Sequence, residues 1–301
     1  MIIGSHVSFS KDQLLGSVKE TLSYGANTFM FYTGAPQNTM RSAINDLNTL
    51  EAYKLMKEND MKLENIVCHA PYVINLANNT EPDKYKFSTD FLIKEIERCE
   101  MLGITKLVLH PGSSVGIEKN TALRNIIYAL NMALSTTDKV TICLETMAGK
   151  GTELGSTTDE LKTIIENINK QELIGVCLDT CHLNDSGINL NNFDEYLKEF
   201  DEKIGIDMIK VIHLNDSKNG VGEHKDRHEV IGFGKIGFDL IHKIASDERF
   251  KNVPKILETP YIGDDDESKD RKYPPYKFEI EMIKSGTFDH GLKEKIRKYY
   301  K

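Results

Sequence analysis

The 301 residues, 40% of them hydrophobic and 28% charged, fit one large globular α/β domain with a solvated surface. The formal charge of -8 disfavours a broad basic surface of the kind that binds nucleic acid. No run approaches the ~20 apolar residues that span a bilayer, and the N-terminal MIIGSHVSFS lacks a signal-peptide pattern, so we expect a cytoplasmic protein without a membrane partner.

Short apolar runs rich in β-branched residues recur eight times along the chain. They lie at residues 2–7, 28–32, 65–70, 106–112, 141–146, 174–180, 209–216 and 255–260. Between them, residues 11–25, 85–103 and 121–136 carry apolar side chains at three- and four-residue steps, as helices packed on a sheet do. Gly25 and Gly103 stand where helix C-caps are expected.

Eight alternations of strand and helix predict a parallel sheet that closes into a single (β/α)8 TIM barrel, an α/β fold that spans residues 1–301 as one domain. A doubly wound open sheet is the alternative. Residues 264–276, DDDESKDRKYPPY, are the only long charge-rich loop, which we expect to lead into the last helix. GFGKIG at 232–237 lacks the Lys-Ser or Lys-Thr ending of a phosphate-binding loop, so we interpret it as an ordinary loop.

Most of the predicted strands end in, or are followed by, a histidine or a carboxylate. These residues are His6, His69, His110, Glu145, Asp179, His182, His213 and Glu258, and the loop after the seventh strand adds Asp226 and His228. Alone, each has an ordinary structural interpretation, such as a hydrogen-bonded histidine or a helix cap. The carboxyl ends of barrel strands form one rim, however, and so many desolvated imidazoles and carboxylates there require cations. We therefore predict a metal site at the C-terminal rim.

We interpret the cysteines near this set as apolar fillers. The five cysteines lack a CxxC pair or another paired spacing, which argues against disulfides and against a thiolate zinc site. Strand alternation places Cys143 on the face of Glu145 and Cys177 on the face of Asp179. Cys181, directly before a candidate ligand, is ambiguous, and we favour a structural thiol over a ligand.

Imidazole and carboxylate ligands without thiolates suit zinc, iron or manganese. Ten candidates exceed the needs of one four-coordinate site, so we expect two or three metal ions with bridging carboxylates. Closely spaced metal ions stabilise both the attacking and the leaving oxygen of a phosphoryl displacement, and they activate water at neutral pH. The residues themselves therefore favour phosphodiester hydrolysis.

Five segments resemble endonuclease IV, a family of metal-dependent apurinic/apyrimidinic endonucleases. They are GSHVS (4–8), HAPYVINL (69–76), GVCLDTCH (175–182), HLNDSKNGVGEHKDRH (213–228) and ILETP (256–260). The resemblance extends over essentially the whole chain and implies a (β/α)8 barrel with three zinc (Zn2+) ions, with manganese or iron an alternative in one site. It implies cleavage 5′ to an abasic site, which leaves a 3′-hydroxyl and a 5′-deoxyribose phosphate. It also implies 3′-phosphodiesterase and 3′-phosphatase activity on blocked ends.

The resemblance further implies which residues hold the metal ions. One zinc would take His69, His110 and Glu145, a second Glu145, Asp179, His213 and Glu258, and a third His182, Asp226 and His228. Glu145 and Glu258 would be the catalytic carboxylates, beside a metal-bound hydroxide that attacks the phosphorus. Three Zn2+ ions contribute +6 to the charge of -8, which leaves about -2 and makes an acidic DNA enzyme physically reasonable.

DNA contacts are expected on loops around the rim. Tyr72 and Val73 resemble the family residues that insert at the abasic position, and residues 33–40 correspond to another inserting loop. Gln37 stands where some members have arginine, so an inserting role remains while a charge for phosphate pairing is lost. Arg227 is a candidate for contact with the DNA backbone. We expect a monomer, nucleoid-associated if bacterial, that acts on double-stranded DNA with abasic sites or blocked 3′ ends.

Two other functions compete with this interpretation. A sugar isomerase or epimerase on a related barrel would need only the second ligand set, and the remaining histidines would be idle. A protein that recognises abasic DNA without cutting it could keep the metals as structural ions. Loss of cleavage with retained binding in a Glu258→Gln variant would favour hydrolysis over recognition alone.

Overall fold

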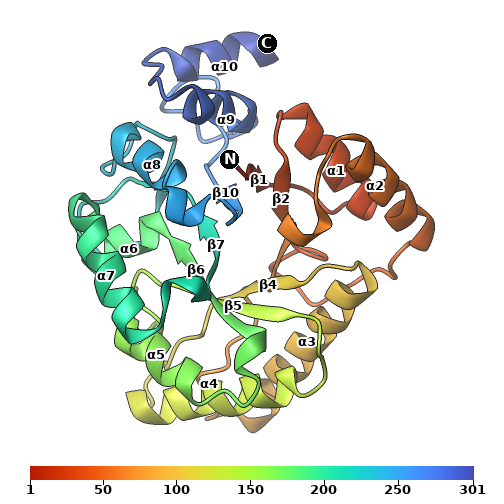
Figure 1. Cartoon of the computed structure of the whole chain (residues 1–301), viewed down its shortest axis with the longest axis vertical. Coiled ribbons are helices and arrows are strands. Elements are labelled where there is room, and N and C mark those ends of the chain that lie inside the picture. The colour runs from red at the N-terminus through yellow and green to blue at the C-terminus, as the bar shows by residue number, and fades with distance from the viewer.

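The computed structural model describes residues 1–301 and contains a closed barrel of eight parallel strands with helices around it (Figure 1). The barrel strands are β1 (Ile3–His6), β2 (Thr28–Phe31), β3 (Val67–His69), β4 (Lys106–Leu109), β5 (Thr141–Glu145), β6 (Ile174–Asp179), β7 (Ile209–His213) and β10 (Lys255–Leu257). Their order around the barrel is β1-β10-β7-β6-β5-β4-β3-β2. The predicted TIM barrel is confirmed, and the open sheet is wrong.

Helices follow the strands in the alternation that the periodicity predicts. They are α1 (Gln13–Ser23), α2 (Asp46–Glu58), α3 (Pro82–Met101), α4 (Lys119–Leu134), α5 (Thr158–Glu166), α6 (Thr180–Ser186), α7 (Phe193–Lys203), α8 (Phe238–Ala245), α9 (Tyr276–Ser285) and α10 (Leu292–Tyr300). Gly25 and Gly103 follow α1 and α3 with φ of 66° and 64°, the left-handed conformation of a helix C-terminus. The predicted caps are therefore confirmed.

The C-terminal part of the chain differs from the prediction in one respect. The charge-rich loop at residues 264–276 runs into α9, and α10 follows it, so the loop does not lead into the last helix. Both helices lie together at the top of the view in Figure 1. GLKEKIRKYYK has few apolar residues, but Leu292 and Ile296 recur at a four-residue step and are both buried, which makes this short helix amphipathic.

The core has two parts, one outside and one inside the barrel. Seventy buried residues form the larger cluster, between the strands and the surrounding helices. The smaller cluster fills the barrel and consists of Met30, Val67, Val108, Cys143, Cys177, Val211 and Ile256. Cys143 and Cys177 are thus apolar fillers, as predicted, and all five cysteines are free and buried.

The strands β1 and β2 approach each other closely at Gly4. A Cβ at Gly4 would lie 1.7 Å from the carbonyl oxygen of Thr28, so only glycine allows this close approach of strands.

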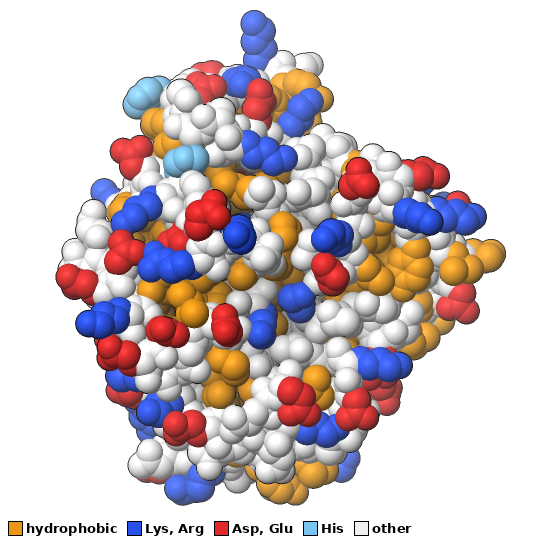
Figure 2. Space-filling view, in the orientation of Figure 1, with side chains coloured by type: hydrophobic (Ala, Val, Ile, Leu, Met, Phe, Trp, Pro, Cys, Tyr) orange, Lys and Arg blue, Asp and Glu red, His pale blue; other side chains and the backbone are white.

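The surface mixes charges of both signs. Figure 2 shows Lys and Arg side chains interspersed with Asp and Glu across one face, without a patch of a single sign. None of the helices combines the length and apolar character needed to cross a bilayer.

Candidate metal centre

The carboxyl ends of neighbouring strands bring the candidate ligands together. Glu145 is the last residue of β5 and Asp179 the last of β6, and Asp179 pairs in register with His213 at the end of β7. Alternation puts the side chain two residues before each carboxylate, Cys143 or Cys177, inside the barrel. Glu145 and Asp179 therefore point into the barrel, in the layer next to that apolar filling on the carboxyl side.

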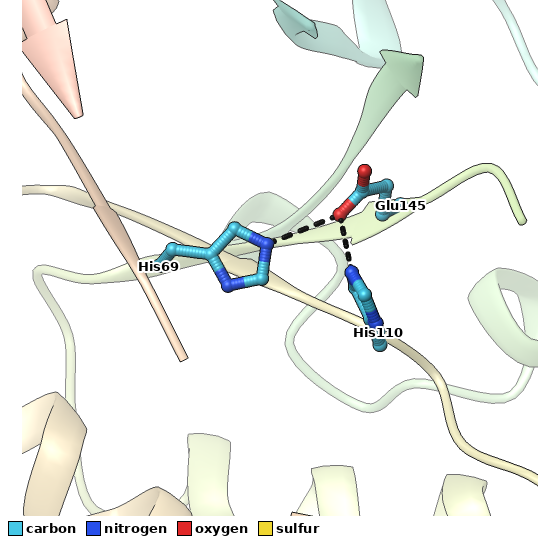
Figure 3. Close-up of side chains that lie close together, drawn as sticks. All are labelled: His69, His110 and Glu145. Carbon is cyan, nitrogen blue, oxygen red and sulfur yellow. Dashed lines mark hydrogen bonds and ion pairs between the residues drawn. The ribbon is translucent and has the colours of Figure 1, made fainter. Parts of the chain in front are cut away.

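One oxygen of Glu145 lies between two imidazoles (Figure 3). Its Oε2 is 3.2 Å from Nε2 of His69 and 3.0 Å from Nε2 of His110. His69 donates its Nδ1 hydrogen to the carbonyl oxygen of Ala70 at 2.7 Å, which fixes the ring and directs Nε2 toward the carboxylate. The first predicted ligand set is thus assembled around Oε2.

The other oxygen of Glu145 faces a different set of groups. Its Oε1 is 2.9 Å from Nδ1 of His213 and 3.3 Å from Nδ1 of His182. The same Nδ1 of His213 lies 3.3 Å from Glu258 Oε2 and 3.7 Å from Asp179 Oδ2. Glu145 therefore reaches two separate clusters with its two oxygens, which is the geometry of a bridging carboxylate.

The third set comes from beyond the barrel strand ends: His182 lies in α6 (Thr180–Ser186), Asp226 in the loop after β7, and His228 directly after that loop. Nε2 of His182 lies 3.1 Å from Oδ1 of Asp226, and Nε2 of His228 lies 3.6 Å from the same oxygen. The Nδ1 hydrogens of these two histidines are directed to backbone carbonyls, of Thr146 at 2.8 Å and of Glu258 at 3.2 Å. Asp226 adopts φ of 53°, a backbone conformation that is uncommon for a non-glycine residue.

The ionisable groups depend on one another because they are removed from water. Burial alone would raise the pKa of Glu145, but the facing imidazoles of His213 and His110 hold it well below its ordinary value. Burial would lower the pKa of His182, which Asp179 and its other carboxylate neighbours raise well above the usual range. Burial also raises the pKa of Asp179 itself. Imidazoles and carboxylates thus stabilise one another's charged forms here, and a metal ion bound to the imidazole nitrogens would compete with protons for them.

The donor set fits metal ions on structural grounds. Ligand atoms within 4.8 Å of one another fall into the three predicted groups, and in a further group Cys181 approaches Asp179 and His228. Nε2 of His228 faces Asp226 and Asp179 but is buried without a hydrogen-bond partner, which is costly for a polar atom without a ligand. Burial raises the pKa of the Cys181 thiol, which opposes the thiolate form needed for coordination.

Comparison with known proteins identifies the family. The model of the Xylose isomerase-like TIM barrel family matches residues 18–285. The probable endonuclease 4 of Staphylococcus carnosus (strain TM300) is 52% identical over 298 residues, which cover 98% of this chain and 99% of the relative. That of Staphylococcus aureus (strain JH9) is 51% identical with the same coverage. The chain belongs to the endonuclease IV family.

Solved structures agree with this membership. Endonuclease IV from Thermus thermophilus superimposes with a TM-score of 0.79 and 26% identity, over 95% of this chain and 98% of that one. A D-tagatose 3-epimerase-like protein has a TM-score of 0.68 at 19% identity, with all of each chain covered, and shares the fold. The resemblance carried by the five sequence segments is confirmed, and a nuclease is favoured over a sugar isomerase.

Polar residues that we did not predict hold the candidate ligands of this endonuclease IV family member in place. Asn215 is buried, and its side-chain nitrogen donates to Asp179 Oδ2 at 2.7 Å and to Glu258 Oε2 at 3.1 Å. Its side-chain oxygen accepts from the Glu258 backbone N–H at 2.9 Å. Asn215 lies two residues after His213 in the segment HLND, and this position beyond a strand-end ligand is the only signal in the sequence.

The loop that carries Asp226 is anchored to α6 by a buried carboxylate. Asp185 accepts hydrogen bonds from the Asp226 backbone N–H at 2.8 Å, from Ser217 Oγ at 2.7 Å and from the Asn219 side-chain nitrogen at 2.9 Å. Asp185 itself is fully buried. These contacts hold the unusual backbone conformation of Asp226, so Asp185 positions a candidate ligand without belonging to the ligand set.

The glycine-rich segment at 232–237 is a loop, as predicted, and its amides bind an internal anion. Asp216 starts β8 (Asp216–Ser217), which pairs with β9 (His228–Glu229) in a small antiparallel ladder. The Asp216 carboxylate accepts from the backbone N–H groups of Gly232 at 2.9 Å, Gly234 at 3.0 Å and Ile236 at 3.0 Å. The backbone amides of this glycine-rich loop are therefore occupied by a carboxylate of the same chain.

A cleft of about 540 Å³ is lined by seven of the candidate ligands. Among the predicted DNA contacts, Tyr72 lines this cleft and its hydroxyl is 2.7 Å from that of Tyr32. Val73 is 40% exposed beside it. Gln37 and Arg227 are on loops outside the lining, and Arg227 donates to the carbonyl oxygen of Asp226.

His6 does not join the ligand groups, although it closes β1 as predicted. It lines a neighbouring hollow together with Tyr32 and Tyr261. Burial lowers the pKa of His6, and its Nε2 has no hydrogen-bond partner. Nine of the ten strand-end candidates therefore converge on the rim, and His6 stands beside them.

Proposed function

We propose that this chain is a DNA-repair endonuclease that hydrolyses the phosphodiester bond 5′ to an abasic site in double-stranded DNA. The products would be a 3′-hydroxyl and a 5′-deoxyribose phosphate. The observation that carries the proposal is Glu145, whose two oxygens face separate clusters of imidazoles and carboxylates in a chain of the endonuclease IV family. Such a bridging carboxylate is what a multi-metal phosphodiesterase requires and what a single-metal sugar isomerase does not.

Three zinc ions would be held by the three ligand groups, with manganese or iron an alternative in one of them. The first group is His69, His110 and Glu145, the second Glu145, Asp179, His213 and Glu258, and the third His182, Asp226 and His228. When bound, zinc supplies Lewis-acid stabilisation of phosphate oxygens and lowers the pKa of coordinated water. Imidazole and carboxylate donors suit these metals, and the Nδ1 contacts of His69, His182 and His228 leave Nε2 free to bind.

The exposure of the ligands indicates the direction from which a phosphodiester would approach. The side chains of Glu145 and His213 are 1% and 0% exposed, whereas those of His110 and Asp226 are 27% and 32% exposed. Glu258, at 17%, lies between these extremes. We infer that DNA contacts the open side formed by His110, Asp226 and Glu258. Glu145 would bridge the metal ions from the buried side of the site.

Loops around the cleft would bind the DNA. We propose that Tyr72 and Val73 insert at the abasic position, because Tyr72 lines the cleft and both side chains are exposed. Gln37 would lie in a second inserting loop, and Arg227 would contact the backbone. Hydrolysis at a blocked 3′ end also breaks a phosphate ester, so the same cleft would support 3′-phosphodiesterase and 3′-phosphatase activity. We propose that the active protein is a monomer.

The test combines metal analysis with cleavage of a defined duplex. Protein purified without chelators should contain close to three metal ions per chain, mostly zinc, and should cut a labelled strand on the 5′ side of a single abasic site. Glu258→Gln should reduce cleavage by about 100-fold or more while abasic DNA is still bound. Glu267→Gln, in the exposed loop before α9, is the matched control and should cleave like the unmodified protein.

Other outcomes would identify the competing functions. Binding of abasic DNA without cleavage by the metal-loaded protein would indicate a recognition protein. One or two manganese, magnesium or cobalt ions, together with epimerisation of a ketose, would indicate a sugar isomerase or epimerase.

A further inference from the structure

The loop between β5 and α5 forms one wall of the cleft and is tied to neighbouring loops. Met147 N–H donates to Gly155 O at 3.0 Å, which closes the loop on itself, and Leu154 N–H donates to Gly112 O at 2.9 Å. Nδ1 of His224, from the loop that carries Asp226, donates to Ala148 O at 2.8 Å. Residues 147–155 are therefore held by contacts to two other loops of the rim, so their side chains are presented in a defined place.

Lys150 stands at the turn of this loop and lines the cleft. Gly149 and Gly151 on either side have φ of 72° and 62°, the left-handed conformation that glycine favours, so the chain turns sharply around Lys150. The side chain of Lys150 is exposed, and its Nζ has neither a carboxylate within 4.0 Å nor a hydrogen bond. The neighbouring Glu153 is not its partner, because Glu153 Oε2 accepts the Lys150 backbone N–H at 2.9 Å.

No other lysine or arginine lines the cleft. The fifteen lining residues include four carboxylates, Glu145, Glu153, Asp226 and Glu258. The Lys150 ammonium group forms an ion pair with none of these four carboxylates. It is therefore available to bind an anionic group of a substrate that enters the cleft. The loop that carries Gln37 offers no cation in its place, since Gln37 is neutral and the guanidinium of Arg41 is buried against Glu95.

We propose that Lys150 is a substrate-binding residue that pairs with a backbone phosphate of the DNA strand lying across the cleft. The inference rests on the proposed function, because it names a contact that an abasic duplex would make at the same site. Lysine suits this role as a flexible point charge that needs no fixed approach geometry. Phosphate contacts of this kind position the duplex and add a salt-dependent term to affinity, without reading the base sequence.

The experiment compares three variants of the metal-loaded full-length protein. Lys150→Gln removes the charge, Lys150→Arg keeps it, and Lys139→Gln is the matched control. Lys139 is exposed, lacks an ion pair, and precedes the same strand β5 at the opposite end of the barrel. Binding of an undamaged duplex is followed by fluorescence anisotropy over a series of salt concentrations, and cleavage of an abasic duplex gives kcat and KM.

The salt slope of binding is the deciding quantity. We expect Lys150→Gln to reduce the slope of log K against log salt by about 0.9, the value for one phosphate contact on duplex DNA. Its loss in kcat/KM should appear as a several-fold higher KM, which Lys150→Arg should largely restore. A slope and KM equal to those of Lys139→Gln would overturn the proposal. Failure of the unmodified protein to cut abasic DNA would instead count against the proposed function, since the anisotropy slope does not depend on cleavage.

Discussion

Nε of Arg41 lies 2.6 Å from Oε1 of Glu95, and neither side chain is exposed to solvent. The other oxygen of Glu95 accepts a hydrogen bond from Thr33 Oγ1 at 2.6 Å, and Arg98 donates to Thr33 Oγ1 at 3.0 Å. Arg41 also donates to backbone carbonyls of residues 35, 38 and 40. One buried carboxylate and two guanidinium groups therefore anchor the loop that carries Gln37 from within.

Glu95→Gln should destabilise the protein by about 3–5 kcal/mol, because it leaves the buried Arg41 and the largely buried Arg98 without their anion. Urea unfolding gives the change in free energy. Glu51→Gln, which breaks an exposed pair with Lys54 on α2, is the control and should stay within about 0.5 kcal/mol. A cost for Glu95→Gln no larger than that of the control would show that the pair does not hold the loop.

Asn215→Ala should weaken metal binding by roughly 10–100-fold, the usual cost of losing a group that orients ligands. The amide holds Asp179 and Glu258 through separate hydrogen bonds, so its removal frees two candidate ligands at once. Competition with a chromogenic chelator measures zinc affinity, and Asn191→Ala at an exposed position is the control. Unchanged zinc affinity together with a lower melting temperature would restrict Asn215 to a role in folding.

The barrel and nine of its rim residues could be predicted because the pattern that identifies each strand lies within a short stretch of the sequence. An apolar run that ends in His or a carboxylate can be recognised from a few neighbouring residues. The closure of eight such strands into a barrel then brings their carboxyl ends together at one rim. Glu95 and Arg98 could not be predicted, since charged residues on an amphipathic helix are normally solvated. Their partners, Arg41 for Glu95 and Thr33 for both, are far away in the sequence, and no periodicity connects them.

The loop contacts could not be predicted for a related reason. Asp185 and Asp216 lie in short polar segments, where a carboxylate that binds backbone amides looks like any loop acid in the sequence. β8 and β9 have two residues each, too few for an alternation pattern. The sequence does not show which backbone amides and side chains donate hydrogen bonds to Asp185 and Asp216. These donors lie near the two carboxylates only in the folded barrel.

Lys255 should make stability rise with pH above neutrality. Its side chain is fully buried, Nζ donates to Phe250 O, and burial lowers the pKa of the ammonium from 10.5 to about 8. Between pH 8 and 10.5 the unfolded chain binds more protons than the folded one, so the free energy of unfolding increases through this window, by roughly 2–4 kcal/mol. Lys255→Met should remove this increase in urea unfolding at pH 8 and pH 10. A variant with the same pH dependence as the unmodified protein would exclude Lys255 as its source.

Glu279 should have the opposite effect at lower pH. This residue of α9 is fully buried, and burial raises the pKa of its carboxyl group to about 8, although Oε1 accepts the Ile231 backbone N–H at 2.9 Å. Between about pH 4.5 and pH 8 the folded protein holds a proton that the unfolded chain has lost, so the contribution of Glu279 to stability declines as pH rises.

Glu279→Gln keeps an acceptor for Ile231 and removes the ionisation, so its unfolding free energy should lose this decline between pH 5 and pH 8. The exposed Glu281→Gln on the same helix should retain it. Because the Lys255 effect begins where the Glu279 effect ends, these two groups together should give the unmodified protein a minimum in stability near pH 8. The Lys255→Met and Glu279→Gln double variant should have no such minimum, and its persistence would mean that other buried groups dominate the pH dependence.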